Sequence, residues 1–159
     1  MTYRITGLDP HQFADIFARE PGAVKAGRAR FLEAPADVGT PCRVSLRDAA
    51  RGERVALIHH TSHDVETPYR SAYAIFVREG AEQAEYVDAV PPVMENRPLA
   101  LRCFDDAGLL KTARLAMPGE ADAAIRAALA SDGAIRYIDV HNAAHGCFAA
   151  RVHRHGDSQ

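Results

Sequence analysis

The sequence predicts an α+β fold, with a mainly antiparallel sheet on which two or three helices pack. Segments that alternate between apolar and polar residues, as strands do, outnumber the segments with helical spacing. Several neighbouring strand segments are also joined by connections too short for the crossover that a parallel pair needs. At 159 residues the chain fits one domain. We expect this domain to span residues 1–152, with a polar tail over residues 153–159.

The first predicted elements are a strand, a helix and a second strand. Tyr3–Gly7 alternates in the manner of a strand. Asp9 can accept a backbone N–H as a helix N-cap, and Pro10 suits the first helical position. A helix is therefore predicted from this point to about Arg19. The next strand is predicted over Arg28–Leu32.

The middle of the chain is predicted to form strands separated by polar loops. Residues 54–59 and 71–78 have the β-branched and aromatic content of buried strands. A shorter strand is predicted over Cys42–Leu46, and a polar loop is expected over His60–Tyr69. A pair of prolines then favours a short helix near Val93–Asn96.

The last third of the chain contains a hairpin, the clearest helix and two strands. Leu99–Phe104 and Leu109–Met117 flank an Asp-Asp-Ala-Gly turn, which is typical of a β-hairpin. Apolar residues recur on one face of the segment from Pro118 to about Ala130, which predicts an amphipathic helix. The last two strands are predicted over Ile135–Val140 and Phe148–Val152.

Composition excludes several classes of function. The net charge is −2 and no basic stripe is present, which argues against a nucleic-acid partner. No run of ~18 apolar residues is present to span a membrane, and no secretory signal is visible, so we expect a cytoplasmic protein. Cys42, Cys103 and Cys147 form no CxxC pair, which predicts reduced thiols rather than a disulfide framework.

Three segments together resemble a known family. They are Pro41–Leu46, then Pro68-Tyr69-Arg70 running into Ile75–Glu79, then His141-Asn142-Ala143 with Gly146-Cys147, and the opening Tyr3-Arg4-Ile5 with Leu8 and Phe13 fits them. The chain is similar from Tyr3 to about Arg151 to the proteins grouped as domain of unknown function 1203. The resemblance implies a single-domain bacterial protein, and it carries no activity, cofactor or catalytic residue to this sequence.

Two cysteines and a histidine are the candidate catalytic residues. Arg43 adjoins Cys42, and a histidine lies two positions before Cys147, so cationic neighbours could stabilise either thiolate as a nucleophile. The alternative is that each cysteine packs as a small buried hydrophobe. His141 is the candidate acid or base. The order Cys42, His141, Asn142 resembles a Cys–His–Asn triad, although consecutive residues in an extended segment point to opposite faces.

Histidines also raise the question of a metal. His141, His145 and Cys147 offer two imidazoles and a thiolate, and a second group lies at His59, His60 and His63. Zinc accepts such ligands. The spacing matches no zinc motif and no HExxH is present, so no metal ligand and no cofactor are assigned, and a zinc-dependent enzyme remains an alternative.

Arginines are the candidate anion-binding residues. Arg43, Arg70, Arg78 and Arg102 lie in or beside predicted strands, where alternation could turn some of them toward a cleft. The alternative is that they form structural ion pairs. The chain has seventeen arginines and only two lysines, which fits either a GC-rich genome or the use of the planar guanidinium for carboxylate or phosphate.

The main hypothesis is therefore a small-molecule pocket for an anionic ligand. Its substrate-binding residues would be Arg43, Arg70, Arg78 and Asn142, with Cys42, His141 and Cys147 as catalytic candidates in a thiol- or histidine-dependent enzyme. The alternative from another class is a non-catalytic binding or accessory module, which could form a homodimer through an exposed strand edge.

Overall fold

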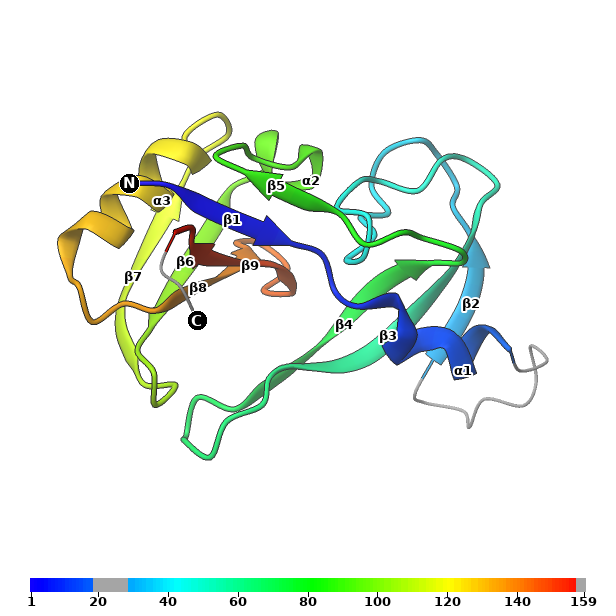
Figure 1. Ribbon diagram of the computed structural model, residues 1–159. Coiled ribbons are helices and arrows are strands. Elements are labelled where there is room, and N and C mark those ends of the chain that lie inside the picture. Colours follow the sequence, from blue (N-terminus) through cyan, green and yellow to red (C-terminus); the bar gives the residue numbers. More distant parts are fainter. Residues whose placement is uncertain (19–28, 157–159) are drawn as a thin grey trace.

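The computed structural model describes residues 1–18 and 29–156, which form two antiparallel sheets (Figure 1). A six-stranded sheet has the order β5-β1-β9-β8-β6-β7, and a three-stranded sheet has the order β2-β3-β4. The strands are β1 (Tyr3–Thr6), β2 (Ala29–Glu33), β3 (Arg54–His63), β4 (Ser71–Arg78), β5 (Glu85–Val87), β6 (Leu99–Phe104), β7 (Leu110–Ala116), β8 (Tyr137–Asn142) and β9 (Phe148–Arg154). The antiparallel pairing agrees with the sequence analysis, which expected one sheet rather than two.

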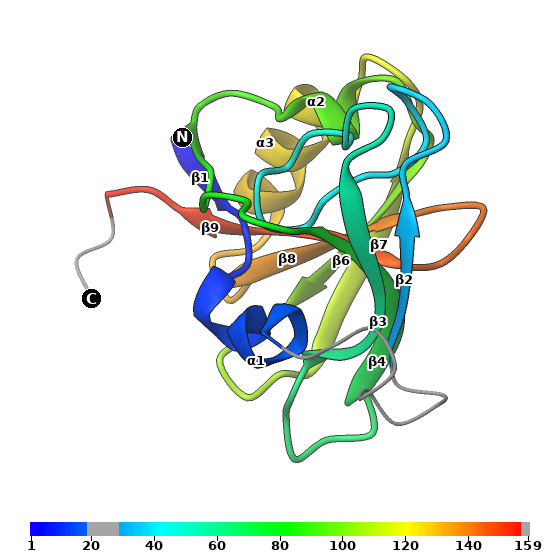
Figure 2. The ribbon, with the colours of Figure 1, turned by 90° about the vertical axis from the view of Figure 1, so that its right-hand side faces the viewer.

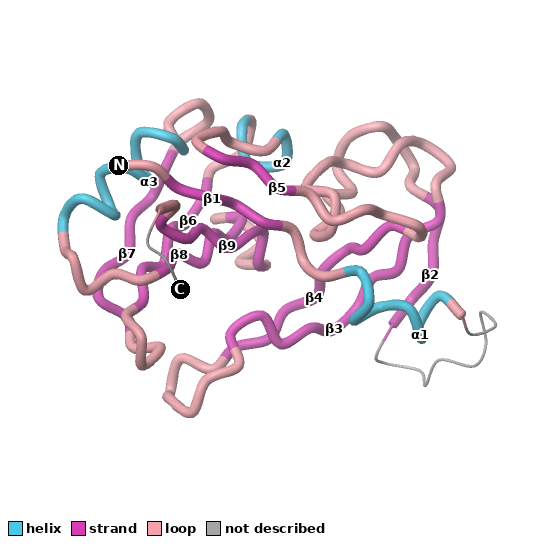
Figure 3. Tube along the Cα trace, in the orientation of Figure 1, coloured by secondary structure: helices cyan, strands magenta, loops and turns pink. Residues whose placement is uncertain are grey.

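The described helices are few and short (Figure 3). They are the 3-10 helix η1 (Pro10–Phe13), α1 (Ala14–Phe17), α2 (Pro92–Glu95) and α3 (Ala121–Ser131). Only α3 is long enough to cover a sheet. Its buried Ile125 and Leu129 share the main apolar core with Leu101 of β6 and Val140 of β8. No helix in the described ranges is long and apolar enough to cross a membrane.

A second core lies between the smaller sheet and the chain around η1. Phe13 of η1 packs with Ile58 of β3 and Ile75 of β4, and Phe148 of β9 joins the same cluster. Figure 2 shows this smaller sheet and α1 beside the strands of the larger sheet. Because Phe148 belongs to the larger sheet, this core fastens the two sheets together.

The hairpin of β3 and β4 is longer than the sequence predicted. His63 pairs with Ser71, so residues 60–63 are strand, and the predicted loop is wrong over that part. The tip of the hairpin reaches the β6–β7 turn, where the Thr67 hydroxyl donates to the Gly108 carbonyl at 3.2 Å. The polar segment continues as strand because β4 pairs with it, and the His63 ring also contacts the Tyr137 hydroxyl of the larger sheet at 2.7 Å.

The predicted strand over Cys42–Leu46 is wrong. The Cys42 N–H donates to the Arg47 carbonyl at 2.9 Å and the Leu46 N–H donates to the Cys42 carbonyl at 3.0 Å, which makes this segment a turn. Leu46 has a φ of +53°, a left-handed conformation that a strand does not contain. An isolated parallel bridge between Cys42 and Phe76 holds the turn against β4.

The predicted helices are confirmed with shifted ends. The Asp9 carboxylate accepts the His11 N–H at 2.9 Å, which is the predicted N-cap, although the helix divides into η1 and α1. Its predicted end at Arg19 and the predicted strand start at Arg28 lie outside the described residues. The helix predicted from Pro118 begins three positions later, since Glu120 closes a turn with the Met117 carbonyl.

The larger sheet brings the two ends of the described chain together. β1 pairs with β9 from Tyr3–Arg154 to Thr6–Arg151. β9 therefore continues two residues into the segment expected to be a polar tail. Beyond the strands, the Thr2 hydroxyl donates to the His155 carbonyl at 2.7 Å. The short strand β5, which the sequence did not predict, pairs with the other edge of β1.

Candidate functional site

The turn between β8 and β9 brings Asn142 and Cys147 together. The Asn142 N–H donates to the Cys147 carbonyl at 2.9 Å, and the Gly146 N–H donates to the Asn142 carbonyl at 2.8 Å. Gly146 has a φ of +75°, which favours glycine at this position of the turn. The Asn142 Nδ2 then donates to the Cys147 Sγ at 3.2 Å, so the turn supplies one of the hydrogen bonds to the thiol.

Arg43 supplies the second hydrogen bond to the same sulfur. Its side chain is only 2% exposed, and its Nη2 donates to the Cys147 Sγ at 3.2 Å. Its Nε donates to the Phe148 carbonyl at 2.6 Å, and its Nη1 donates to the Pro41 carbonyl. The guanidinium therefore joins the turn around Cys42 to β9 and holds a fixed position beside the thiol.

The charge of Arg43 has no carboxylate partner among the described residues. Burial lowers the pKa of this guanidinium, and the Cys147 and Cys42 sulfurs oppose that shift. An arginine nevertheless keeps its proton in proteins. A buried cation is costly unless its donors are satisfied, and the Arg43 donors are taken by two carbonyls and by the Cys147 sulfur.

A cavity of about 550 Å³ opens beside this sulfur. Its polar lining residues include Arg43, Asn142 and Cys147, and Arg97 and His145 also line it. No aspartate or glutamate lines it within the described chain. The apolar wall is formed by Pro41, Leu57, Tyr73, Ala74, Phe76, Pro98 and Ala144. The cavity therefore combines cationic and polar lining residues with an apolar wall.

The Asn142 side chain has an unused acceptor in this site. Asn142 is 9% exposed and its Oδ1 has no hydrogen-bond partner. A buried amide oxygen without a partner is costly. A ligand N–H or O–H in the cavity could satisfy it.

Four of the predicted site residues lie outside this cavity, namely Cys42, Arg70, Arg78 and His141. Cys42 is fully buried in the second core, where its Sγ accepts the Arg78 backbone N–H at 3.3 Å. The Arg78 side chain pairs with Glu53 at 3.4 Å. Arg70 is exposed and pairs with Asp64 at 2.8 Å. The structure thus brings Arg43, Asn142 and Cys147 together and leaves Cys42, Arg70 and Arg78 elsewhere.

His141 lies on the opposite face of β8 from Asn142, since consecutive strand residues alternate. It is 3% exposed and its Nδ1 lies 2.9 Å from the Gly146 carbonyl. A carbonyl only accepts, so Nδ1 carries the proton and Nε2 is left as an acceptor. Burial lowers the pKa of His141, which favours the neutral ring. The ring packs edge-on against Tyr73 at 4.9 Å and does not line the cavity.

The two histidine groups do not assemble into a metal centre. Within the part of the chain that the structure describes, no group of three or more His, Cys, Asp or Glu side chains is placed to hold a metal ion. His141 is bonded to Gly146 and Cys147 to Arg43, while His145 is exposed. In the second group, His63 turns inward and its Nε2 lies 2.7 Å from the Tyr137 hydroxyl.

Comparison with known proteins places this site within a family. Residues 39–154 match the family described as "Protein of unknown function (DUF1203)". The chain belongs to the DUF1203 family. The matched range includes Arg43, Asn142 and Cys147. No curated protein and no solved structure matches the chain.

One lining residue of the DUF1203 site was missed by the sequence analysis. Arg97 lines the cavity and its Nη2 donates to both oxygens of Asp48 at 3.0 Å. The two residues are 49 positions apart, and no local pattern links them. The Arg43–Cys147 contact spans 104 positions, and the sequence analysis placed both residues in one pocket without predicting this contact.

Proposed function

We propose that the protein binds a small molecule in the Cys147 cavity and that Cys147 acts there as the nucleophile of a thiol-dependent reaction. One observation carries the proposal: the buried Arg43 guanidinium has no carboxylate partner in the described residues and donates to the Cys147 Sγ. A cationic donor beside a sulfur stabilises its thiolate, which is the reactive form. Asn142 adds a second donor to the same atom.

The reaction that fits is attack on an electrophilic carbon. The Cys147 Sγ would form a bond to that carbon, while the bond to the leaving group breaks and the leaving group departs with the electron pair. The apolar wall with Leu57 and Phe76 would hold the body of the ligand. We extend the proposal to an anionic group on the ligand, because Arg43 lines the cavity without a carboxylate partner in the described chain, whereas Arg97 is paired with Asp48.

A reducing compartment suits this chemistry. The three cysteines Cys42, Cys103 and Cys147 are free thiols in the described chain. Free thiols persist in the cytoplasm, which is the location that the proposal implies. His141 would act through position, since its neutral ring packs on Tyr73 and Phe148, the residue next to Cys147.

Alkylation with iodoacetamide tests the proposal. Intact and peptide mass spectrometry would follow modification of each cysteine at about pH 6, where an ordinary thiol is protonated. We expect Cys147 to react selectively and faster than free cysteine, while the fully buried Cys42 and Cys103 stay unmodified. An Arg43→Gln change should slow the reaction about tenfold by removing the cation, and Arg70→Gln is the matched control. A Cys147 that reacts no faster than free cysteine would assign Arg43 a purely structural role.

A second hypothesis is a non-catalytic binding module that assembles through strand β7. β7 is an edge strand of the larger sheet, and it exposes 71% of Leu115. Met117, directly after the strand, is 52% exposed. Exposed apolar edges invite strand addition or dimerisation. Light scattering of the protein and of a Leu115→Lys variant would decide this: a dimer that the charge dissociates supports the module, and a monomer removes it.

A further inference from the structure

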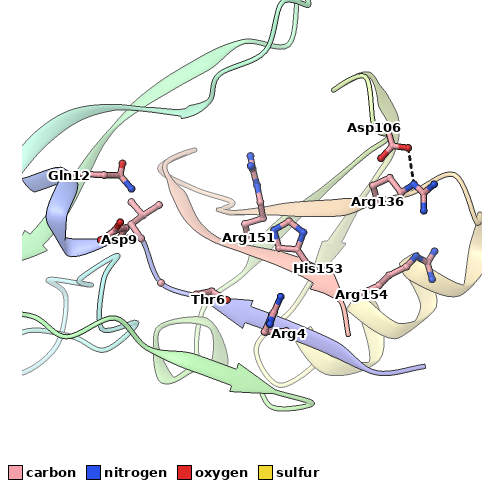
Figure 4. Close-up of a pocket in the computed structure, with 11 residues that line it drawn as sticks. Arg4, Thr6, Asp9, Gln12, Asp106, Arg136, Arg151, His153 and Arg154 are labelled. Carbon is pink, nitrogen blue, oxygen red and sulfur yellow. Dashed lines mark hydrogen bonds and ion pairs between the residues drawn. The ribbon is translucent and has the colours of Figure 1, made fainter. Parts of the chain in front are cut away.

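A second cavity, separate from the Cys147 site, is lined by four arginines. Its volume is about 590 Å³, and it lies between the segment that joins β1 to η1, strand β9 and the β6–β7 turn (Figure 4). The lining residues with charged or titratable side chains are Arg4, Asp9, Asp106, Arg136, Arg151, His153 and Arg154. It shares no lining residue with the Cys147 cavity.

The register of β1 and β9 explains why these cations converge. Arg4 is the cross-strand partner of His153, and Thr6 is the partner of Arg151. Cross-strand partners point to the same face of a sheet. The side chains therefore leave the face opposite α3, and Figure 4 shows Arg4, His153 and Arg151 along one side of the cavity.

Two of the four arginines are already neutralised. Arg136 pairs with Asp106 at 3.0 Å, and Arg151 pairs with Asp139 at 2.6 Å. The remaining acidic lining residue, Asp9, is occupied by the N–H and the ring of His11.

The other two arginines keep their charge uncompensated within the described chain. Each nitrogen of the Arg154 guanidinium already donates a hydrogen bond, to the carbonyls of Leu129, Ile135 and Asp132 and to the Met1 Sδ, but none of these acceptors carries a net charge. The Arg4 Nε is buried and has no hydrogen-bond partner. A buried charged donor without an acceptor is costly, and an anion in the cavity would supply that acceptor.

We propose that this cavity binds the phosphoryl group of a small phosphomonoester, with Arg4 as a primary contact. A phosphoryl group presents several acceptor oxygens and two negative charges, which match two uncompensated guanidinium groups better than a single carboxylate does. The cavity volume leaves room for the organic part of a small molecule. This binding site goes beyond the thiol chemistry at Cys147.

Isothermal titration calorimetry with inorganic phosphate and with glycerol 2-phosphate tests the proposal, in chloride buffer at constant ionic strength. We expect saturable binding of both, with acetate weaker. Arg4→Gln should weaken phosphate about tenfold, because it removes a charge-assisted hydrogen bond. No hydrogen bond of the Arg4 side chain is present in the described structure, so this variant should keep the wild-type circular dichroism spectrum. Arg70→Gln, which removes an exposed cation that does not line the cavity, should bind phosphate as the wild type does.

Three outcomes would overturn the proposal. They are the absence of saturable binding at millimolar phosphate, equal weakening by Arg4→Gln and Arg70→Gln, and acetate binding as tight as phosphate. Alkylation of Cys147 should leave phosphate affinity unchanged. The experiments can therefore contradict the proposal for one cavity without contradicting the proposal for the other.

Discussion

The two faces of the six-stranded sheet differ sharply in chemistry although the same strands supply both. The face under α3 is apolar, with Ile5, Leu101 and Val140 fully buried in one core. The opposite face presents Asp139 from the strand that carries Val140, and Arg4 from the strand that carries Ile5. Alternation along a strand thus lets one set of residues form the fold and the next set form cavities and polar contacts.

The most buried groups of the polar face are paired with one another. Asp139 is 1% exposed and pairs with Arg151. The Tyr137 hydroxyl lies 2.7 Å from the ring of His63. Such networks stabilise a fold only when their members are all paired. The comparison therefore predicts that the apolar face tolerates loss of volume poorly, and that the polar face tolerates loss of a partner poorly.

The largest effect is expected on the apolar face. Leu101→Ala should lower the free energy of unfolding by about 3 kcal/mol, because it leaves a cavity in the main core. The matched control is Arg102→Ala on the next residue, which faces the other way and loses one bond to the Tyr73 hydroxyl. Urea denaturation should show a loss of about 1 kcal/mol or less for the control. Equal losses for the two variants would contradict the division between faces.

The next effect is expected on the polar face. Asp139→Asn removes the carboxylate that neutralises Arg151 and should cost about 2 kcal/mol, less than a fully buried pair because Arg151 is 31% exposed. A double-mutant cycle with Arg151→Met measures the coupling directly. Additive effects of the two changes would show that the two side chains stabilise the sheet independently.

The pH dependence of stability should separate the faces further. Burial lowers the pKa of His141 and of His153, both on the polar face. Between these lowered values and the unfolded value of about 6.5, the unfolded chain binds protons that the folded chain does not. The free energy of unfolding should therefore have its full value above about pH 6.5 and should fall as the pH decreases toward the lowered pKa values.

Urea midpoints at about pH 7.5 and pH 5.5 would measure this loss. His141→Gln should flatten the pH dependence, whatever its effect on stability at neutral pH. His11→Gln is the control, because His11 is exposed. If His141→Gln left the difference in urea midpoint between the two pH values unchanged, the acid sensitivity would belong to other groups.

The smallest effect is expected at the outer edge of the sheet. Leu115→Thr should change the free energy of unfolding of the monomer by less than about 0.5 kcal/mol, because this side chain is already exposed to water. A larger loss that grows with protein concentration would show that β7 is buried in an assembly.

Local sequence patterns predicted most helices and strands, whereas long-range contacts determine the features that were predicted wrongly. Alternation and helical spacing were sufficient for β1, α3 and the β6–β7 hairpin. The strand expected at Cys42–Leu46 is a turn because its backbone bonds close within the segment and with Arg47, while only an isolated bridge joins it to Phe76 of β4. β3 extends to His63 by pairing with β4, and its last residue also contacts Tyr137 of the larger sheet, a contact that no local window contains.

The candidate site was predicted in the same uneven way. The sequence identified Cys147, Arg43 and Asn142, because polar residues interrupt apolar segments there. It could not separate Cys147 from Cys42, since each has a basic neighbour. Burial and the direction of the Arg43 side chain distinguish the two thiols, and both depend on tertiary packing.

The pairing of β1 with β9 delays the closure of the larger sheet during synthesis. Thr2 and His155, which join at the end of this pair, are 153 positions apart. On the ribosome, β1 therefore emerges long before the strand that will lie beside it, and the larger sheet cannot close until β9 has left the exit tunnel. Contacts of such separation slow folding and leave an early strand edge open to other chains. Overexpression at low temperature, or with a chaperone that holds nascent chains, should raise the soluble yield.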